Sequence, residues 1–432
     1  NDAVLQVPQG KVVGGSSGIN GLMFIRGDRR GFDTWETSGA TDWNYDALLP
    51  YFKRSERAPG REPAYRGTNG PMPVEVPPTT APLWEACCIA ALEVGHPFNK
   101  DCNAETGEGV SFHDYNIRDG RRVSAADAYL TPALGRLNLT VRDAADVQRL
   151  IMDGTTCRGV AYRHGGRNSY AAAEREVILT AGAIPSPKLL LLSGIGPANH
   201  LRSVGIDVTV DLPGVGENFH DHVKSQVSFS ATRPVHVATM ARKPHVMLRS
   251  APSVDPDLHI LFTDFAVGPR WQPLSMPGYS VIFGLLTPAS RGHVRLASDN
   301  PDRPPIVDPN FLTDPGDLDR LVQGLKAARE IGSTQALAPL RKEEVHPGPD
   351  VRTDAEYRGY IRSTVTSYTH LVGTCRIGTD EGAVVNPRLK VHGVDNLRIA
   401  DASVMPSVPA ANTNPAVLAI AERAADLIKQ DR

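Results

Sequence analysis

The residues best suited to do chemistry lie near the end of the chain. An apolar run over residues 397–400 predicts a buried strand that ends at Asp401, and a proline-rich bend follows it. Asn414 and Pro415 then predict a helix start, with Asn414 as the N-cap and Pro415 at the first helical position. Free N–H groups and the helix dipole favour negative charge at such a point, so the stretch can seat an anionic cofactor. An ordinary C-terminal helix that closes an α/β domain has the same pattern.

A second candidate loop lies near the start of the chain. There, Gly10-Lys-Val-Val-Gly-Gly-Ser-Ser-Gly-Ile-Asn20 precedes an apolar run. A glycine pair followed by two serines can bring backbone N–H groups against a ligand before a helix starts. Many Gly-Ser turns bind nothing, so this loop indicates a ligand site only in combination with other motifs.

Composition describes an ordinary globular protein. The 432 residues are 41% hydrophobic and 22% charged, with a formal net charge of −2, which gives no electrostatic reason to expect nucleic acid or an anionic membrane as a partner. The sequence has no run of 18 apolar residues, so we expect no membrane span. Its five cysteines are odd in number and lack zinc-ligand or C-x-x-C spacing. These features favour a reducing compartment, and we expect a cytoplasmic protein.

Hydrophobic periodicity predicts elements that could hold these loops. A buried strand over 176–182 ends in small residues and leads into a helix, so it places a helix N-terminus at the carboxyl end of a strand, where α/β sheets bind ligands. Alternating runs predict antiparallel strands between residues 223 and 364, crossed by a helix over 318–331. The basic stretch 234–248 is predicted to be a loop. Further helices are predicted over 43–56, 82–94 and 186–193, and short strands over 139–141 and 160–162.

Seven motifs in fixed order resemble the glucose–methanol–choline (GMC) family of flavin-dependent alcohol oxidoreductases, in particular its bacterial choline dehydrogenase-like and hydroxymethylfurfural oxidase-like members. Together they span nearly the whole chain, which makes the resemblance specific. They are residues 10–27, Arg122-Val-Ser-Ala-Ala-Asp-Ala-Tyr-Leu130, residues 175–187, Ser193-Gly-Ile-Gly-Pro197, Asp211-Leu-Pro-Gly-Val-Gly-Glu-Asn218, His370-Leu-Val-Gly-Thr-Cys-Arg-Ile-Gly378 and residues 401–428.

The resemblance implies an α/β plus α+β fold in two discontinuous domains. Residues 1–57, 121–222 and 366–432 would form a Rossmann-like FAD-binding domain. Residues 58–120 and 223–365 would form a substrate domain built on an antiparallel sheet that roofs the flavin.

The chain departs from the family in one large feature. Family members begin with a strand, a G-x-G-x-x-G turn and a helix that hold the ADP half of FAD. That fingerprint is not found in the sequence, because Gly194-Ile-Gly196 and Gly214-Val-Gly216 both lack the third glycine. A unit of roughly 30 residues or more is therefore missing from the family pattern. Truncation, proteolysis, disorder and genuine loss all remain open explanations.

The resemblance also assigns the chemistry. The family removes the hydroxyl proton of an alcohol and passes a hydride to flavin N5, and His370 matches the family's catalytic histidine. A neutral imidazole suits the role of general base near pH 7. Asn414 matches the second active-site position, where it would hydrogen-bond the substrate oxygen. Each residue has a simpler interpretation: His370 as a buried structural histidine, and Asn414 as only a helix cap.

The implied cofactor contacts come from three segments. The helix that begins with Asn414 and Pro415 would stabilise negative charge on the reduced flavin. Ile19 occupies the place where family members with covalent flavin carry histidine, so we expect non-covalent FAD. The other matching residues are Gly14, Gly15, Ser16, Ser17 and Asn20 along the flavin and Asp401 and Ala402 near its ribityl chain and pyrophosphate.

Other functions remain open at this stage. The sequence His220-Asp221-His222 suggests metal ligands, but no third ligand is apparent and we expect no metal. The expected partners are a small-molecule alcohol and an electron acceptor, oxygen or another. A hydroxynitrile lyase-like enzyme, which needs FAD only structurally, and a repurposed protein that has lost FAD binding are the alternatives.

Overall fold

The computed structural model describes residues 4–235, 237 and 240–431 of the chain, in a mixed α/β fold. Its helices are α1 (Arg29–Thr37), α2 (Tyr45–Ser55), α3 (Pro82–Glu93), α4 (Pro185–Leu192), α5 (Ala198–Ser203), α6 (Pro315–Gly332), α7 (Asp354–Thr364) and α8 (Thr413–Gln430). Short two-stranded pairs connect the larger elements; they are β1 (Glu56–Arg57) with β2 (Met72–Pro73), β4 (Ile117–Arg118) with β5 (Arg121–Arg122), β10 (Ile195–Gly196) with β11 (Val210–Asp211), β15 (Val267–Gly268) with β16 (Gln272–Pro273), and β18 (His293–Arg295) with β19 (Ile306–Asp308).

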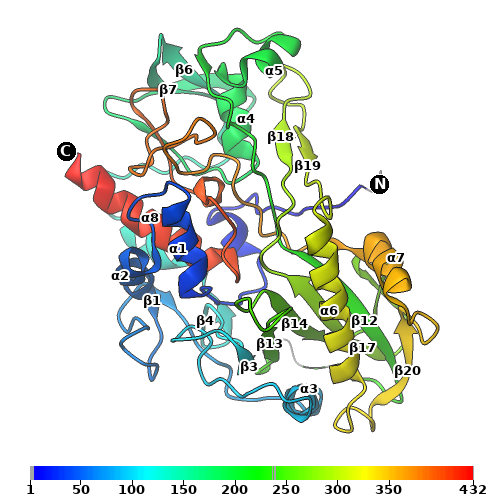
Figure 1. Ribbon diagram of the computed structural model, residues 1–432. Coiled ribbons are helices and arrows are strands. Elements are labelled where there is room, and N and C mark those ends of the chain that lie inside the picture. The colour runs from blue at the N-terminus through cyan, green and yellow to red at the C-terminus, as the bar shows by residue number, and fades with distance from the viewer. Residues whose placement is uncertain (1–3, 236, 238–239, 432) are drawn as a thin grey trace.

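The largest element is a seven-stranded antiparallel sheet. Its order is β20-β12-β17-β14-β13-β3, and β21 also pairs with β12. Helix α6 lies across one face of the sheet, with α3 and α7 near its ends (Figure 1). The strands are β3 (Gly109–Phe112), β12 (Val223–Ala231), β13 (Pro244–Leu248), β14 (Leu258–Thr263), β17 (Gly278–Leu285), β20 (Arg341–His346) and β21 (Thr366–Ser367).

Alternation along the strands gives the sheet two different faces. Leu258 and Ile260 join the core beneath the helices, so His259 between them points to the opposite face. His259 pairs with Gly284 on β17, and Tyr368 packs directly on that glycine. A Cβ at position 284 would lie 2.2 Å from the Tyr368 ring, so only glycine fits there. The face away from the helices is therefore the face near His370.

The second half of the fold is built on two parallel strands. Strands β9 (Val177–Leu179) and β22 (Leu397–Ile399) pair in parallel, and each leads into a turn at its carboxyl end. Helix α8 packs against α2 in the same half (Figure 1). A three-stranded antiparallel sheet of β6 (Asp146–Asp153), β7 (Thr156–His164) and β8 (Arg167–Ala172) lies beside them.

Most predicted elements are confirmed, with boundaries shifted by a few residues. Two local predictions are wrong. Residues 139–141 form no strand, because no described strand lies alongside to supply hydrogen bonds. Residues 244–248, predicted as part of a loop, form β13, whose apolar residues Val246 and Leu248 are buried beneath the helices. Residues 236, 238 and 239 of that predicted loop lie outside the described residues.

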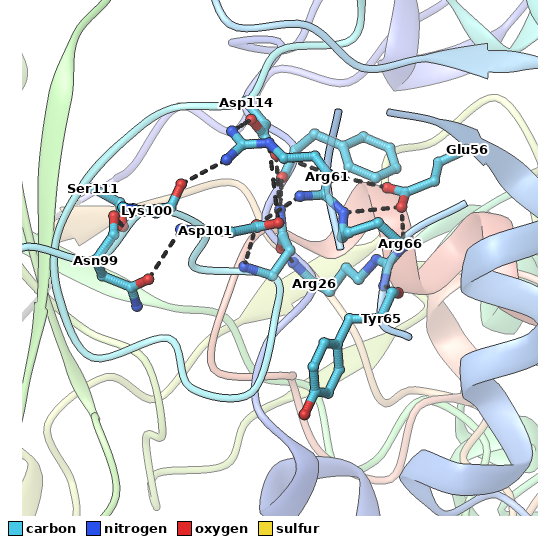
Figure 2. Close-up of polar contacts among 12 residues, drawn as sticks. Arg26, Glu56, Arg61, Tyr65, Arg66, Asn99, Lys100, Asp101, Ser111 and Asp114 are labelled. Carbon is cyan, nitrogen blue, oxygen red and sulfur yellow. Dashed lines mark hydrogen bonds and ion pairs between the residues drawn. The ribbon is translucent and has the colours of Figure 1, made fainter. Parts of the chain in front are cut away.

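A buried ion network fastens three loops near the junction of the two halves. Arg66 donates to Glu56 at 2.9 Å, to Asp101 at 2.6 Å and to Asp114 at 2.8 Å. Arg26 also binds Glu56, and Arg61 binds Asp114, so three guanidinium groups face three carboxylates (Figure 2). Burial alone lowers the pKa of Arg66, but the charges of Asp114 and Glu56 outweigh it and raise that pKa.

No helix within residues 4–235 or 240–431 is long and apolar enough to cross a membrane. All five cysteines are buried and free.

Candidate active site

His370 lies in the segment that follows β21, where contacts from distant parts of the chain hold it. Its backbone N–H donates to Asp221 Oδ1 at 2.7 Å. Its Nδ1 lies 2.9 Å from Nδ1 of His222, and its ring stacks on Tyr368 with centroids 5.5 Å apart. An imidazole held by its backbone, its ring face and one ring nitrogen has little freedom to turn, which is what a positioned base requires.

The residue before His370 has an unusual backbone conformation. Thr369 has φ of 65°, a left-handed conformation that is costly for a β-branched residue. Its N–H donates to Ser367 Oγ at 2.7 Å, and Ser367 in turn donates to Asp221. Asp221 therefore stabilises the sharp turn that directs His370 toward the face of the sheet away from α6.

The protonation state of His370 follows from its neighbours. Burial lowers its pKa well below 6.5, and His222 and Lys224 lower it further, so the ring is neutral near pH 7. Burial likewise lowers the pKa of His222 to about 3. The side-chain Nδ2 of Asn412 lies 3.2 Å from His370 Nε2 and donates to it. His370 then carries its proton on Nδ1, donates to His222, and leaves Nε2 as the basic nitrogen.

Helix α8 begins two residues earlier than the sequence predicts. Its N-cap is Asn412, and Asn414 and Pro415 lie at its second and third positions, so the prediction of Asn414 as N-cap is wrong. Proline is tolerated there because the first N–H groups of a helix have no partner within the helix. Asn412, which the sequence analysis did not select, contacts His370. The amide nitrogen of Asn414 is buried without a hydrogen-bond partner, as expected for a group that binds a ligand.

The sequence His220-Asp221-His222, considered as a possible metal site, positions the active site instead. His220 accepts from Val408 N at 2.9 Å and contacts Asn218 O at 2.6 Å, so it holds the bend before α8. Asp221 and His222 hold His370. Among the described residues, no group of three or more histidine, cysteine or acidic side chains could hold a metal.

The glycine loop forms a short 3-10 helix over Gly15–Gly18, not the start of an α-helix. Gly14 has φ of 96°, and a Cβ there would lie 3.1 Å from Ala126 Cβ. The Ser17 hydroxyl accepts from Ala125 N at 2.8 Å. Arg122 donates to the Asn20 side chain at 2.7 Å, so two motifs about 100 residues apart form one structure.

Asp401 ties the ends of the two parallel strands together. Its Oδ2 accepts from Gly182 N at 2.9 Å and Ser186 Oγ at 2.6 Å, and its Oδ1 accepts from Ser403 N at 2.8 Å. Both carboxylate oxygens are thus occupied within the protein. Asp401 shapes the turn that carries Ala402, and the turn's backbone remains available to a ligand.

We expect Asp401→Ala to weaken FAD retention and to lower the melting temperature. The substitution leaves three donors at the turn unsatisfied, at a cost of about 1–3 kcal/mol for each one that water does not reach. Flavin released on ultrafiltration, measured against Ser186→Ala, checks this, since Ser186→Ala removes only one of these donors. Equal flavin loss in the two variants would contradict the role given to Asp401.

The arrangement fits a flavin on several independent observations. Gly15 has open space where a Cβ would lie, and Ile19 beside it is 49% exposed, so the loop offers an apolar, accessible surface. The orphaned amide of Asn414 and the free N–H groups of α8 suit the polar edge of the isoalloxazine. The residues that would hold the flavin are thus Gly14–Asn20, the turn at Asp401 and Ala402, and the start of α8.

Comparisons with known proteins agree with this geometry. Family models described as GMC oxidoreductase match residues 1–224 and 288–421. Human mitochondrial choline dehydrogenase is 37% identical over 455 aligned residues, covering 99% of this chain and 76% of the relative. Oxygen-dependent choline dehydrogenase of Rhizobium meliloti (strain 1021) is also 37% identical, covering 99% and 83%. The crystal structure of pyridoxine 4-oxidase from Mesorbium loti superposes with a TM-score of 0.93 at 33% identity, covering 98% of this chain and 84% of that one.

The chain therefore belongs to the GMC oxidoreductase family. It is an FAD-dependent oxidoreductase that oxidises alcohols, with the family's mixed α/β fold and large antiparallel sheet.

Proposed function

We propose that His370 is the general base of this alcohol oxidation. Its Nε2 accepts the hydroxyl proton of the substrate while Nδ1–H stays bonded to His222. FAD, when bound, supplies the acceptor for the hydride that leaves the carbinol carbon. The observation that carries the proposal is a buried, neutral imidazole whose Nδ1 contacts His222 and whose Nε2 accepts only from Asn412, at the N-terminus of α8.

Two asparagines complete the proposed site. Asn414 hydrogen-bonds the substrate oxygen through its unpartnered amide nitrogen, and Asn412 holds His370 Nε2 until the alcohol replaces it. The same helix N-terminus stabilises negative charge that develops on the bound flavin. We further propose non-covalent FAD, because Ile19 offers no nucleophile, and the two-domain division at residues 57, 120, 222 and 365. The electron acceptor is oxygen or another small molecule.

Anaerobic mixing of the FAD-loaded protein with a panel of primary alcohols tests the proposal. We expect at least one alcohol to bleach the oxidised-flavin absorbance with formation of its aldehyde. A protein that holds FAD but stays oxidised with every alcohol would overturn the assignment. Oxygen consumption during turnover then distinguishes an oxidase from a dehydrogenase.

The fall of activity at acidic pH provides a separate prediction. Burial raises the pKa of Asp221 to about 6, against hydrogen bonds from Ser367 and His370 that lower it. Protonation of Asp221 as the pH falls weakens its hydrogen bonds to His370 N and Ser367 and so loosens the turn that holds the base. We expect kcat/KM to fall below about pH 6. An Asp221→Asn variant whose kcat/KM falls over the same pH range would contradict this prediction.

A further inference from the structure

The face of the sheet beside His370 carries an unusual group of aromatic and imidazole rings. His259 stacks on Tyr368 with centroids 6.4 Å apart, and His245 Nδ1 lies 3.1 Å from His259 Nε2. His113 stacks on His245 at 4.3 Å. We call His113, His245, His259 and Tyr368 the ring wall. It extends from His370, on which Tyr368 stacks, across strands β14 and β13.

Several polar atoms of the ring wall have no partner. His113 Nδ1 and Nε2, His245 Nε2 and Tyr368 Oη are buried and make no hydrogen bond. Burial lowers the pKa of His245 to about 4 and that of His113 well below 6.5, so both rings are neutral near pH 7. Buried polar groups are nearly always satisfied in folded proteins. The Tyr368 hydroxyl and the ring-wall nitrogens are therefore available to the hydrogen-bonding atoms of a ligand.

Lys224 brings a positive charge to the same face. It lies on β12 between Val223 and Ser225, and its Nζ lies 3.7 Å from the Trp271 ring centroid and 5.0 Å from that of Tyr368. Burial lowers the pKa of Lys224 to about 8, against the attraction of Asp221, so the ammonium is mostly protonated at pH 7.

The nearest carboxylate that acts on Lys224 is already engaged. Both oxygens of Asp221 accept hydrogen bonds, one from His370 N and one from Ser367 Oγ. Asp221 is also fully buried behind His370 and cannot turn toward a substrate. Asp221 therefore holds its negative charge behind His370, while Lys224 brings its positive charge to the face that carries the neutral rings.

We propose that Lys224 is a specificity-determining residue, and that the site takes an aromatic primary alcohol bearing an uncharged or anionic hydrogen-bond acceptor and rejects alcohols with a fixed positive charge. This inference rests on the proposed function of His370. Trp271 and the ring wall provide aromatic surroundings for the aromatic part of the substrate, and Lys224 and the unpartnered atoms of the ring wall bind the acceptor. A quaternary ammonium group would meet the Lys224 ammonium at short range in a poorly hydrated site.

A series of benzyl alcohols with different para groups tests the inference. The substrates are 4-(hydroxymethyl)benzoate, 4-methylbenzyl alcohol and 4-(trimethylammonio)benzyl alcohol, with choline as a fourth. We expect the unmodified enzyme to favour the anionic over the cationic alcohol in kcat/KM by at least about tenfold. Lys224→Met should reduce this ratio at least about tenfold, and Lys224→Glu should invert the preference.

A matched control and a binding measurement separate the outcomes. Lys326 lies on α6, which covers the opposite face of the sheet. Lys326→Met removes one positive charge there and should leave the ratio unchanged. Flavin spectral shifts with benzoate and with benzyltrimethylammonium report charge preference without turnover. If no alcohol bleaches the flavin, but benzoate binds more tightly to the unmodified protein than to Lys224→Met, the proposed function is overturned. The charge preference assigned to Lys224 then still holds. An unchanged ratio and unchanged ligand preference in Lys224→Met would overturn the inference.

Discussion

Replacing His370 with alanine is expected to slow reduction of bound flavin by an alcohol about 10²–10⁴-fold, the usual contribution of a positioned general base. The substitution removes the imidazole whose Nε2 faces Asn412 at the start of α8, and it leaves Asp221 bonded to the backbone at position 370. FAD retention should therefore stay normal. The loss should appear in the rate of the anaerobic reductive half-reaction, measured by stopped-flow absorbance.

Two further measurements distinguish a base from a structural histidine. Added imidazole should restore part of the lost rate in His370→Ala, which it would not do if the variant were merely misfolded. His164→Gln changes an exposed histidine at the end of β7 and should leave the rate unchanged. A His370→Ala enzyme within tenfold of the unmodified rate would refute the assignment of the base.

The sequence singled out the candidate site residues that belong to local motifs. His370, the glycine loop and the segment from Asp401 to Asn414 each have a recognisable order of residues, and the structure places the first and last of these together. The roles of Asp221 and His222 were not predicted, because their contacts to His370 join residues about 150 positions apart. The only local signal was the His-x-His spacing, which was weighed as a possible metal site and set aside because no third ligand was apparent.

The start of α8 illustrates a second limit. Asn412 and Asn414 are both good helix-capping residues, and sequence alone gives no reason to prefer one. Proline does not decide between them, since it is tolerated throughout the first turn. Tertiary contact decides: Asn412 reaches His370, while Asn414 keeps an unpartnered amide.

The polar residues of the antiparallel sheet were missed for a different reason. Strand alternation shows that Lys224 and His259 point away from their apolar neighbours, but not which face meets His370. Which face this is depends on the packing of Tyr368 against Gly284, a contact that strand alternation cannot reveal. The basic character of residues 234–248 likewise hid the strand β13, whose inward residues are apolar.

The buried ion network around Arg66 yields the largest expected effect on stability. Arg66→Met leaves Glu56, Asp101 and Asp114 short of one positive charge in a site closed to water, since Arg66 and Glu56 are fully buried. Removing one partner of a buried ion pair lowers the free energy of unfolding by about 3–5 kcal/mol. Chemical denaturation of the FAD-loaded protein should show this as a lower midpoint.

Matched variants test whether the geometry of the network matters. Arg66→Lys keeps the charge but loses the forked geometry that reaches three carboxylates, so its loss should be smaller than that of Arg66→Met. Arg163→Met breaks an exposed pair with Asp302 and should leave the midpoint unchanged. Equal midpoints for Arg66→Met and Arg163→Met would show that the network contributes nothing. Arg26 follows the glycine loop in the chain and pairs with Glu56 in this network. A variant that weakens the network should therefore also release FAD more readily.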